Sequence, residues 1–223
     1  MIIMASKYKN KIIDETTILN DTINEFLEKL IDKKPTPGGG SVAGMVAALG
    51  QGLVMMVSHY TIGNEKYSDV QPLVLKAMEL GNNYLEKFKK LIDEDIEVYQ
   101  MVRAAYKLPK ETEEQKVERK KTIDDALTKA MQTPMTVLEY SLKGIELINE
   151  IYTKFNINLI SDLGVACKLF ESSAYSAYLN ILINEKSLVK DGKYVNSEYA
   201  LDVCNNKIRK MSDEIFSKIA EIM

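Results

Sequence analysis

The sequence is poor in the residues that build metal sites and disulfide frameworks. Its 223 residues include one histidine, His59, and two cysteines, Cys167 and Cys204, which lie far apart. These residues match no metal-binding spacing and form no Ser-His-Asp or Cys-His constellation, so we expect no metal. Two separated cysteines are typical of reduced thiols. Because residues 1–7 also lack the charged region and the length of a signal peptide, we expect a cytoplasmic protein.

The chain also has few helix breakers and few strand signals. Only five prolines punctuate it, and alternating runs of β-branched residues are scarce, which predicts an all-α protein. A length of 223 residues with 46% hydrophobic content predicts one domain with a sizeable core. A net charge of −3 gives no reason to expect nucleic acid or an anionic membrane as a partner. We therefore expect a single-domain bundle of long helices over residues 16–223, preceded by an N-terminal arm over residues 1–15.

One stretch, residues 35–64, contains no charged residue although 27% of the chain is charged. It opens with the sequence PTPGGGS, in which the prolines disfavour a helix and the glycines permit positive φ. Ser41 is a favoured N-cap, so we expect a helix to begin directly after it. The amides of that first turn would suit a carboxylate or another electron-rich group. No Gly-Lys-Ser/Thr follows the glycines, which argues against a P-loop, and no clear strand precedes them, which argues against a dinucleotide fingerprint.

The apolar run that follows has nearly the length of a membrane span. Gln51 interrupts it, Ser58-His59 ends it, and glycine and alanine are frequent in it, which favours a fully buried bundle helix. A membrane-inserted helix over residues 42–57 is the alternative, and it predicts extraction that depends on detergent. The single histidine at the end of the run is expected to be a packed residue rather than a catalyst.

A long helix is expected over residues 71–106, and one acid stands out in it. Asp95 interrupts an otherwise apolar stripe, whereas Asp93, about 200° away at 100° per residue, falls on the expected solvent face. A buried acid must be paired, hydrogen-bonded or protonated. Asp95 is therefore either a structural aspartate or a desolvated carboxyl group with a raised pKa that serves as a general acid or base. The stripe consists of Val74, Met78, Gly81, Leu85, Phe88, Ile92, Asp95, Tyr99, Val102 and Tyr106.

Five further helical regions are predicted. An amphipathic helix is expected over residues 16–34, and a second follows the capping-box pair Thr112 and Gln115 up to about residue 132. Thr133-Pro134 is expected to break or kink it before a helix over residues 135–155. A helix over residues 162–184 presents a mostly small or polar face, which admits close helix approach or lines a pocket. The last helical region covers residues 193–223.

Several motifs occur in an order that resembles a known protein family. The resemblance is to the formiminotransferase-cyclodeaminase family, in its C-terminal cyclodeaminase domain, and extends from about residue 16 to the C-terminus. The family also includes stand-alone methenyltetrahydrofolate cyclohydrolases. The matching stretches are PGGGSVA at 37–43, MV at 56–57, TIG at 61–63 with Tyr67, DEDIEVY at 93–99, LPK at 108–110, TP at 133–134, SDLGVA at 161–166 and NILIN at 180–184.

The resemblance implies an all-helical fold that dimerises and binds a tetrahydrofolate derivative, its substrate, in a cleft at or near the dimer interface, with no cofactor. It implies a catalytic aspartate in the long helix, which corresponds to Asp95, the residue that the periodicity selects independently. Tyr99 departs from the phenylalanine that family members commonly have. The sequence contains no formiminotransferase domain, so we expect a separate formiminotransferase as a possible partner.

The resemblance also implies a reaction. We expect a formiminotetrahydrofolate cyclodeaminase, which converts 5-formiminotetrahydrofolate to 5,10-methenyltetrahydrofolate and ammonia with Asp95 as general acid/base. The alternatives are a methenyltetrahydrofolate cyclohydrolase in the same site and a non-catalytic helical module that binds folate or a partner protein.

The resemblance also implies a set of residues that contact the substrate. The glycine loop and Ser41 would position it, while Asp162 and Asn180 would hydrogen-bond the pterin edge, and Lys107 and Lys110 would meet the glutamate tail. Each residue also has a plain structural interpretation. Asp162 can be a first-turn acid, Asn180 with Asn184 can form interhelical hydrogen bonds, and the lysines can be ordinary surface residues. The loop glycines are Gly38, Gly39 and Gly40.

Overall fold

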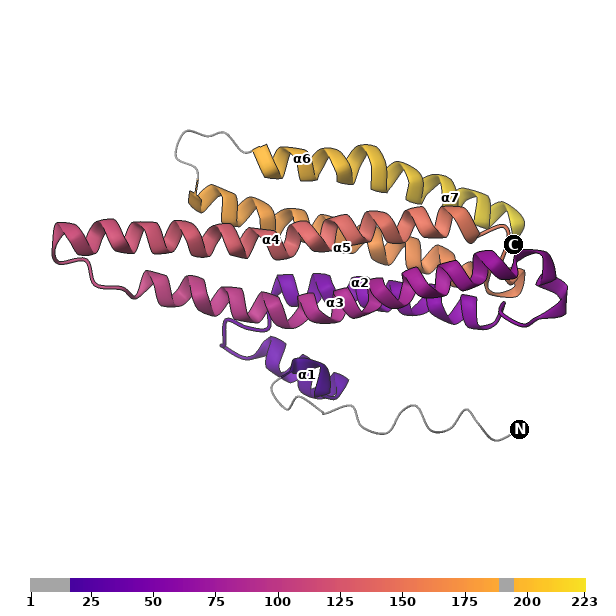
Figure 1. Ribbon diagram of the computed structural model, residues 1–223, viewed down its shortest axis with the longest axis horizontal. Helices are drawn as coiled ribbons and strands as arrows, with labels where there is room; N and C mark the ends of the chain where they lie inside the picture. The colour runs from indigo at the N-terminus through magenta and orange to yellow at the C-terminus, as the bar shows by residue number, and fades with distance from the viewer. Residues whose placement is uncertain (1–16, 189–194) are drawn as a thin grey trace.

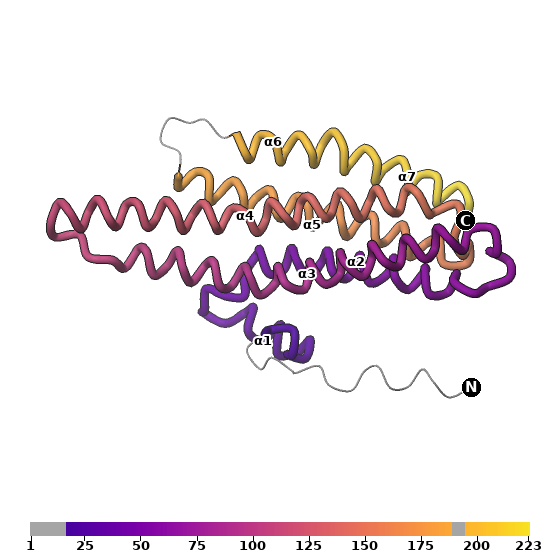
Figure 2. The backbone as a smooth tube through the Cα atoms, viewed as in Figure 1, coloured from indigo at the N-terminus to yellow at the C-terminus, as the bar shows by residue number. Residues whose placement is uncertain are grey.

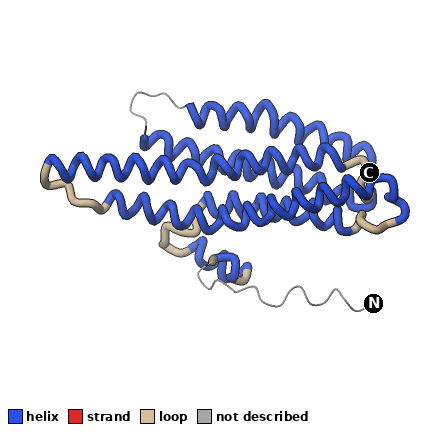
Figure 3. The backbone as a smooth tube through the Cα atoms, viewed as in Figure 1, coloured by secondary structure: helices blue, strands red, loops and turns tan. Residues whose placement is uncertain are grey.

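The computed structural model describes residues 17–188 and 195–223, and these residues form helices and connecting turns without a strand (Figure 3). The chain is therefore all-α, as the sequence predicts, while the expected N-terminal arm over residues 1–15 lies outside the described residues. In chain order the helices are η1 (Ile18–Asn20), α1 (Ile23–Ile31), α2 (Gly39–His59), η2 (Glu65–Val70), α3 (Gln71–Tyr106), α4 (Glu113–Ile151), η3 (Ile157–Leu159), α5 (Ile160–Leu188), α6 (Val195–Val203), η4 (Cys204–Arg209) and α7 (Lys210–Ile222).

Four long helices form the body of the molecule. α3 and α4 run side by side as a long hairpin, and α2 and α5 lie behind them in the view of Figure 1. The helices α6 and α7 lie along the opposite side of the bundle from α1, as the backbone trace shows (Figure 2). One continuous apolar core fills the space between the long helices, and it includes Phe88, Ile148 and Phe170.

Small residues let the central helices approach one another closely. Ser173 of α5 is fully buried, and its hydroxyl group donates a hydrogen bond of 2.8 Å to the carbonyl oxygen of Ala43 in α2. A Cβ atom on Gly144 of α4 would overlap the ring of Phe170. The small-residue face expected on α5 therefore serves close packing in its middle.

Helix α2 is only partly buried, which corrects the expectation of a fully buried helix. By length and composition it is the one helix of the described chain that could cross a membrane, and 50% of its most apolar window is buried. Its buried face packs against α3 and α5, but Leu49 is 57% exposed. His59 is exposed rather than packed.

Two other expectations about helices are wrong for local reasons. The predicted N-terminal helix is shorter, because Thr22 and Glu25 form a capping box that starts α1 only at Ile23. Only Phe26 of its expected apolar face is buried, whereas Leu27 is 50% exposed. Pro134 does not end a helix, since α4 runs through it from Glu113 to Ile151.

The carbonyl oxygen that Pro134 leaves without a partner has another donor. Proline lacks an N–H group, so the carbonyl of Ala130, four residues earlier, loses its helical hydrogen bond. The side-chain Nδ2 of Asn184 in α5 donates to this oxygen at 3.3 Å. An interhelical hydrogen bond thus takes the place of the missing helical one, which fits the interhelical role considered for Asn184.

Candidate active site

Asp95 of α3 caps the N-terminus of α2. Helix α2 begins at Gly39, and its N-cap residue Gly38 has an extended backbone (φ −138°, ψ −158°) and no capping side chain. The backbone N–H and the hydroxyl group of Ser41 both donate to Oδ2 of Asp95, each at 2.8 Å. A capping side chain ordinarily accepts from the second or third amide of its own helix. Here a carboxyl group from another helix accepts the third amide instead.

This contact corrects one prediction and explains another. Ser41 is not the N-cap, because the extended Gly38 allows the helix to begin three residues earlier than expected. The sequence nevertheless predicts a carboxylate at the first-turn amides of this helix, and that carboxylate belongs to the protein itself. The two sequence signals, an acid in an apolar stripe and a glycine-rich helix start, are therefore two halves of one contact.

Gly40 makes the contact possible. A Cβ atom at this position would overlap both Oδ1 and Cγ of Asp95. The neighbouring Gly39 has more room, because its nearest side-chain atom would be Nδ2 of Asn180 at 3.7 Å. Glycine is thus required at residue 40 by the closeness of the carboxyl group.

The environment of Asp95 changes its acidity. Burial raises the pKa of the half-buried Asp95 carboxyl group, and the hydrogen bonds from the Ser41 side chain and backbone oppose this rise without cancelling it. Within the described chain, no group donates a hydrogen bond to Oδ1. Asp95 therefore has one anchored oxygen and one available oxygen.

A cleft with a volume of about 340 Å³ opens beside this carboxyl group. Its walls come from the loop before α2 and from α3, α4 and the C-terminal half of α5. Carboxyl, amide and aromatic groups share the cleft with apolar side chains, which is a composition typical of small-molecule sites. Among the lining residues are Thr36, Gly38, Gly39, Gly40, Asp95, Tyr99, Tyr106, Ala130, Pro134, Asn180, Ile183 and Asn184.

The structure brings most of the predicted site residues together. Gly38, Gly39, Gly40, Asp95 and Asn180 line the cleft. Nδ2 of Asn180 donates to the carbonyl oxygen of residue 176 in its own helix at 2.8 Å, so its hydrogen bond is intrahelical rather than interhelical. Ser41 is fully buried behind Asp95.

Three predicted residues lie elsewhere in the chain. Asp162 is at the opposite end of α5, 18 residues before Asn180, which corresponds to about 27 Å along a helix. Lys107 and Lys110 are exposed residues after the end of α3 and do not line the cleft. The structure therefore does not assemble them with Asp95.

Sequence reasoning assigned several cleft residues to the core. Tyr99, Val102 and Tyr106 continue the stripe of Asp95 at helical spacing, but they line the cleft, and Tyr99 and Tyr106 are 41% and 47% exposed. The stripe passes from core to cleft wall at Asp95 because α2, which packs against the earlier part of α3, has its N-terminus beside Asp95. The polar interruption at Asp95 marks that transition and was the available signal.

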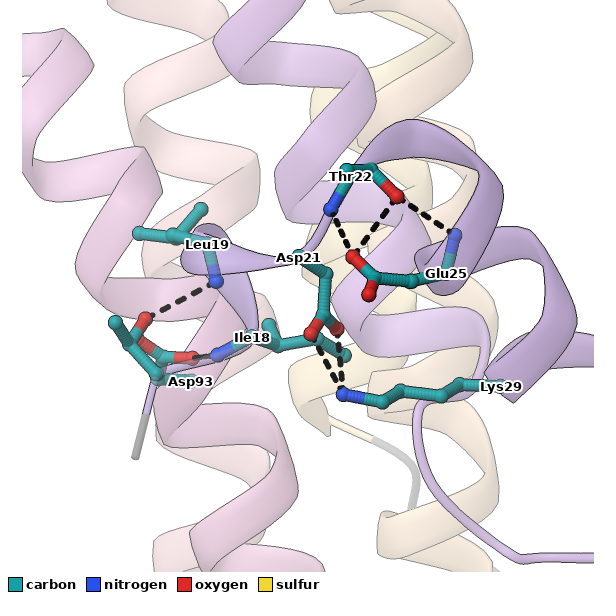
Figure 4. Close-up of polar contacts among 8 residues, drawn as sticks. Ile18, Leu19, Asp21, Thr22, Glu25, Lys29 and Asp93 are labelled. Carbon is teal, nitrogen blue, oxygen red and sulfur yellow. Dashed lines mark hydrogen bonds and ion pairs between the residues drawn. The ribbon is translucent and has the colours of Figure 1, made fainter. Parts of the chain in front are cut away.

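Asp93 was expected on the solvent face, and the structure corrects this (Figure 4). Its carboxyl group accepts hydrogen bonds from the hydroxyl group of Thr17 and, at 3.1 Å, from the backbone N–H of Ile18. Ile18 and Phe26 then pack on Ile92. Asp93 therefore attaches the η1–α1 segment to the side of α3. The described residues bring no three His, Cys, Asp or Glu side chains together as a metal site.

The fold and the site define a class of protein, a helical bundle with a carboxyl group held at a helix N-terminus inside a small-molecule cleft. The sequence profile of the formiminotransferase-cyclodeaminase family matches residues 22–199, and the chain belongs to that family of folate enzymes. A methenyltetrahydrofolate cyclohydrolase of Methylorubrum extorquens is 37% identical over 76% of this chain and 81% of its own length.

Two other relatives extend the comparison. The formimidoyltransferase-cyclodeaminase of Rattus norvegicus is 29% identical over 79% of this chain, which spans 33% of that longer protein. The crystal structure of formiminotetrahydrofolate cyclodeaminase from Thermotoga maritima matches with a TM-score of 0.79 and 26% identity, covering 92% of this chain and 98% of that one.

Proposed function

We propose that this chain hydrolyses 5,10-methenyltetrahydrofolate to 10-formyltetrahydrofolate, with Asp95 as the general acid/base. The observation that carries this proposal is the Asp95 carboxyl group, which is half-buried, lines the cleft and is fixed by Ser41 through Oδ2, while Oδ1 accepts no hydrogen bond from the described residues. The 37% identity to a cyclohydrolase over most of both chains supports hydrolysis as the first candidate reaction. Cyclodeamination is the first expectation from the sequence, but the motifs occur in both groups of enzymes and do not separate the two reactions.

The carboxyl group suits both halves of such a hydrolysis. Water adds to the cationic methenyl carbon, a C–O bond forms, and Asp95 takes one proton of the water. The carbon–N5 bond then breaks: Asp95 returns its proton to N5, and the hydroxyl proton leaves to solvent as the formyl C=O forms. The net result is consumption of one water and release of one proton. As a carboxylate, Asp95 also stabilises the cationic substrate.

Cyclodeamination is the second candidate, and the match to the Thermotoga maritima cyclodeaminase over nearly its whole length favours it. In this reaction N10 attacks the carbon of the protonated formimino group and a carbon–N10 bond forms. Asp95 accepts the N10 proton and passes it to the formimino nitrogen, whose bond to the carbon then breaks as ammonia leaves. Both reactions need one acid/base group at the same folate centre.

The other site residues receive supporting roles in this proposal. The backbone of Gly38, Gly39 and Gly40 and the amide of Asn180 would position the pterin end of the folate, since they line the cleft next to Asp95. Ser41 would hold the carboxyl group. Asp162 is the acid in the first turn of α5, and we infer that it favours the helix dipole rather than contacting the folate.

Assays with the two purified folates test the proposal. Hydrolysis removes the absorbance of the methenyl compound, and cyclodeamination releases ammonia from the formimino compound. The Asp95→Asn variant should keep its fold and lose turnover of whichever substrate the wild type uses by about 10²-fold or more. A wild type that binds folate but turns over neither compound would make the chain a binding module.

We further infer a cytoplasmic homodimer, with a separate formiminotransferase as a possible supplier of substrate if the cyclodeaminase reaction applies. Support for the dimer comes from large apolar side chains on the neighbouring helices α2 and α5. Leu49 is 57% exposed, and Leu179 and Ile183 are each 61% exposed. Ile183 also lines the cleft, so a partner on this face would adjoin the site.

A further inference from the structure

The η1–α1 segment is attached to α3 by one carboxyl group and a small apolar cluster. Of residues 17–31, only Ile18 and Phe26 are buried. The carboxyl group of Asp93 accepts hydrogen bonds from the hydroxyl group of Thr17 and, at 3.1 Å, from the backbone N–H of Ile18 (Figure 4). Because the segment buries little apolar surface, its attachment depends strongly on these two charge-assisted hydrogen bonds.

The apolar cluster under the segment packs against the helix turns that hold the Asp95 carboxyl group. Val42 directly follows Ser41 in α2, and Ile96 directly follows Asp95 in α3. Both Val42 and Ile96 pack against the cluster, so the segment rests on the two turns that form the Asp95–Ser41 contact. The cluster consists of Ile18, Phe26 and Ile92, and the partly buried residues packed against it are Leu30, Val42, Met45 and Ile96.

A loop that forms one wall of the cleft directly follows the segment. α1 ends at Ile31 and α2 begins at Gly39, and residues 32–38 join them. Thr36 of this loop lines the cleft and also a groove that the loop shares with η1–α1. The end of the loop at α2 is fixed by the contact of Asp95 with that helix, whereas the end at α1 is fixed only while α1 stays on the bundle. The loop residues that line the cleft are Pro35, Thr36 and Gly38.

We propose that Asp93 is a positioning residue for the folate cleft: by holding η1–α1 on α3, it keeps the loop of residues 32–38 in the position that binds substrate. This inference rests on the proposed folate function and gives Asp93 a role distinct from that of Asp95. A loop that leaves the cleft part of the time lowers the apparent affinity by the fraction of competent molecules. Since Ser41 anchors Asp95 separately, loss of the attachment should weaken substrate binding more than it slows the chemical step.

Steady-state kinetics of four variants test this role. Thr17→Val removes the hydroxyl donor without changing α3, and it should raise KM about three- to tenfold while kcat stays within about twofold. Thr17→Ser keeps the hydroxyl group and should restore the KM of the wild type. Asp93→Asn weakens both hydrogen bonds by removing the charge and should raise KM at least as much as Thr17→Val. Glu97→Gln makes the same change one turn further along α3, at an exposed side chain, and should have no effect.

Two further measurements separate positioning from a general loss of stability. Ser212→Ala on α7 removes the hydrogen bond from a buried hydroxyl group to Glu171, so it should lower the melting temperature and leave KM unchanged. Hydrogen exchange without substrate should rise in Thr17→Val at residues 23–31 and at residues 32–41 together, because the loop follows the segment.

An unchanged KM in both Thr17→Val and Asp93→Asn, or faster exchange in α1 with none in the loop, would overturn the positioning role and leave the proposed function standing. A KM that rises equally in Ser212→Ala would also overturn it. A wild type inactive on both folates would overturn the proposed function and the role in folate binding with it, whereas the exchange measurement reports the coupling of segment and loop without any substrate.

Discussion

At the scale of single residues, the site depends on how closely one glycine approaches one acid. A methyl group on Gly40 would occupy the space of the Asp95 carboxyl group, whereas Gly39 faces Asn180 at an ordinary contact distance. We expect Gly40→Ala to displace the carboxyl group and reduce kcat at least tenfold, because a misplaced catalytic group loses its reaction geometry. Gly39→Ala is the matched control and should keep kcat within a few-fold. Steady-state kinetics of both variants with one folate substrate would decide, and equal losses would contradict the role of Gly40.

Asp95 should lower stability at neutral pH. Its folded-state pKa is raised by burial, so the folded protein binds more protons than the unfolded chain between the two pKa values. Protonated Asp95 contributes fully to the free energy of unfolding below the unfolded-state pKa, and this contribution is lost as the pH rises through the folded-state pKa. We therefore expect Asp95→Asn, which can still accept the Ser41 hydrogen bonds, to melt at the same or a higher temperature than the wild type at pH 7.

The advantage of Asp95→Asn should shrink as the pH is lowered through the folded pKa of Asp95. Thermal unfolding of both proteins across an acidic pH series measures this directly. A variant that is clearly less stable than the wild type at neutral pH would show that the ionised carboxylate stabilises the fold, contrary to the burial argument. Loss of activity with no loss of stability is the pattern expected of a functional group.

At the scale of elements, Pro134 in α4 and Asn184 in α5 form one coupled unit. Asn184 donates to the Ala130 carbonyl that Pro134 leaves unpaired. Asn184→Ala should therefore cost about 0.5–1.5 kcal/mol of unfolding free energy in the wild type. In a Pro134→Ala background the helix can restore its own hydrogen bond, and the cost should fall toward zero. A double-mutant cycle by chemical denaturation measures the coupling, and strictly additive effects would contradict it.

The elements also show which features local sequence determines. The bounds of α3 and the capping box before α4 are as predicted, since caps and periodicity depend on residues a few positions apart. The direction of Asp95 follows from the same periodicity. Its partner Ser41 is 54 positions away, and the partner of Asp93 is 75 positions away in η1. Spacing within one helix gives no information about such partners, which is why Asp93 was assigned to the solvent face.

At the scale of the whole molecule, the apolar surface on α2 and α5 bears on assembly. Exposed leucine and isoleucine side chains on adjacent helices are typical of an interface. We expect Leu179→Lys to shift the protein from dimer to monomer, because a charged side chain would be buried against its partner. Light scattering after size-exclusion chromatography measures the mass. Lys186→Glu, an exposed charge change on the same helix, is the control, and a wild type that is already monomeric would contradict the proposed dimer.

The anchoring of Asp95 through a single oxygen has a consequence for timing. Because both Ser41 donors occupy Oδ2, every proton that Asp95 takes or gives in the proposed reaction would pass through the same atom, Oδ1. Uptake of a proton and its return to the substrate would then take place one after the other, because one oxygen atom serves both transfers. The slower of the two proton transfers would then limit the rate at which this carboxyl group completes one catalytic cycle.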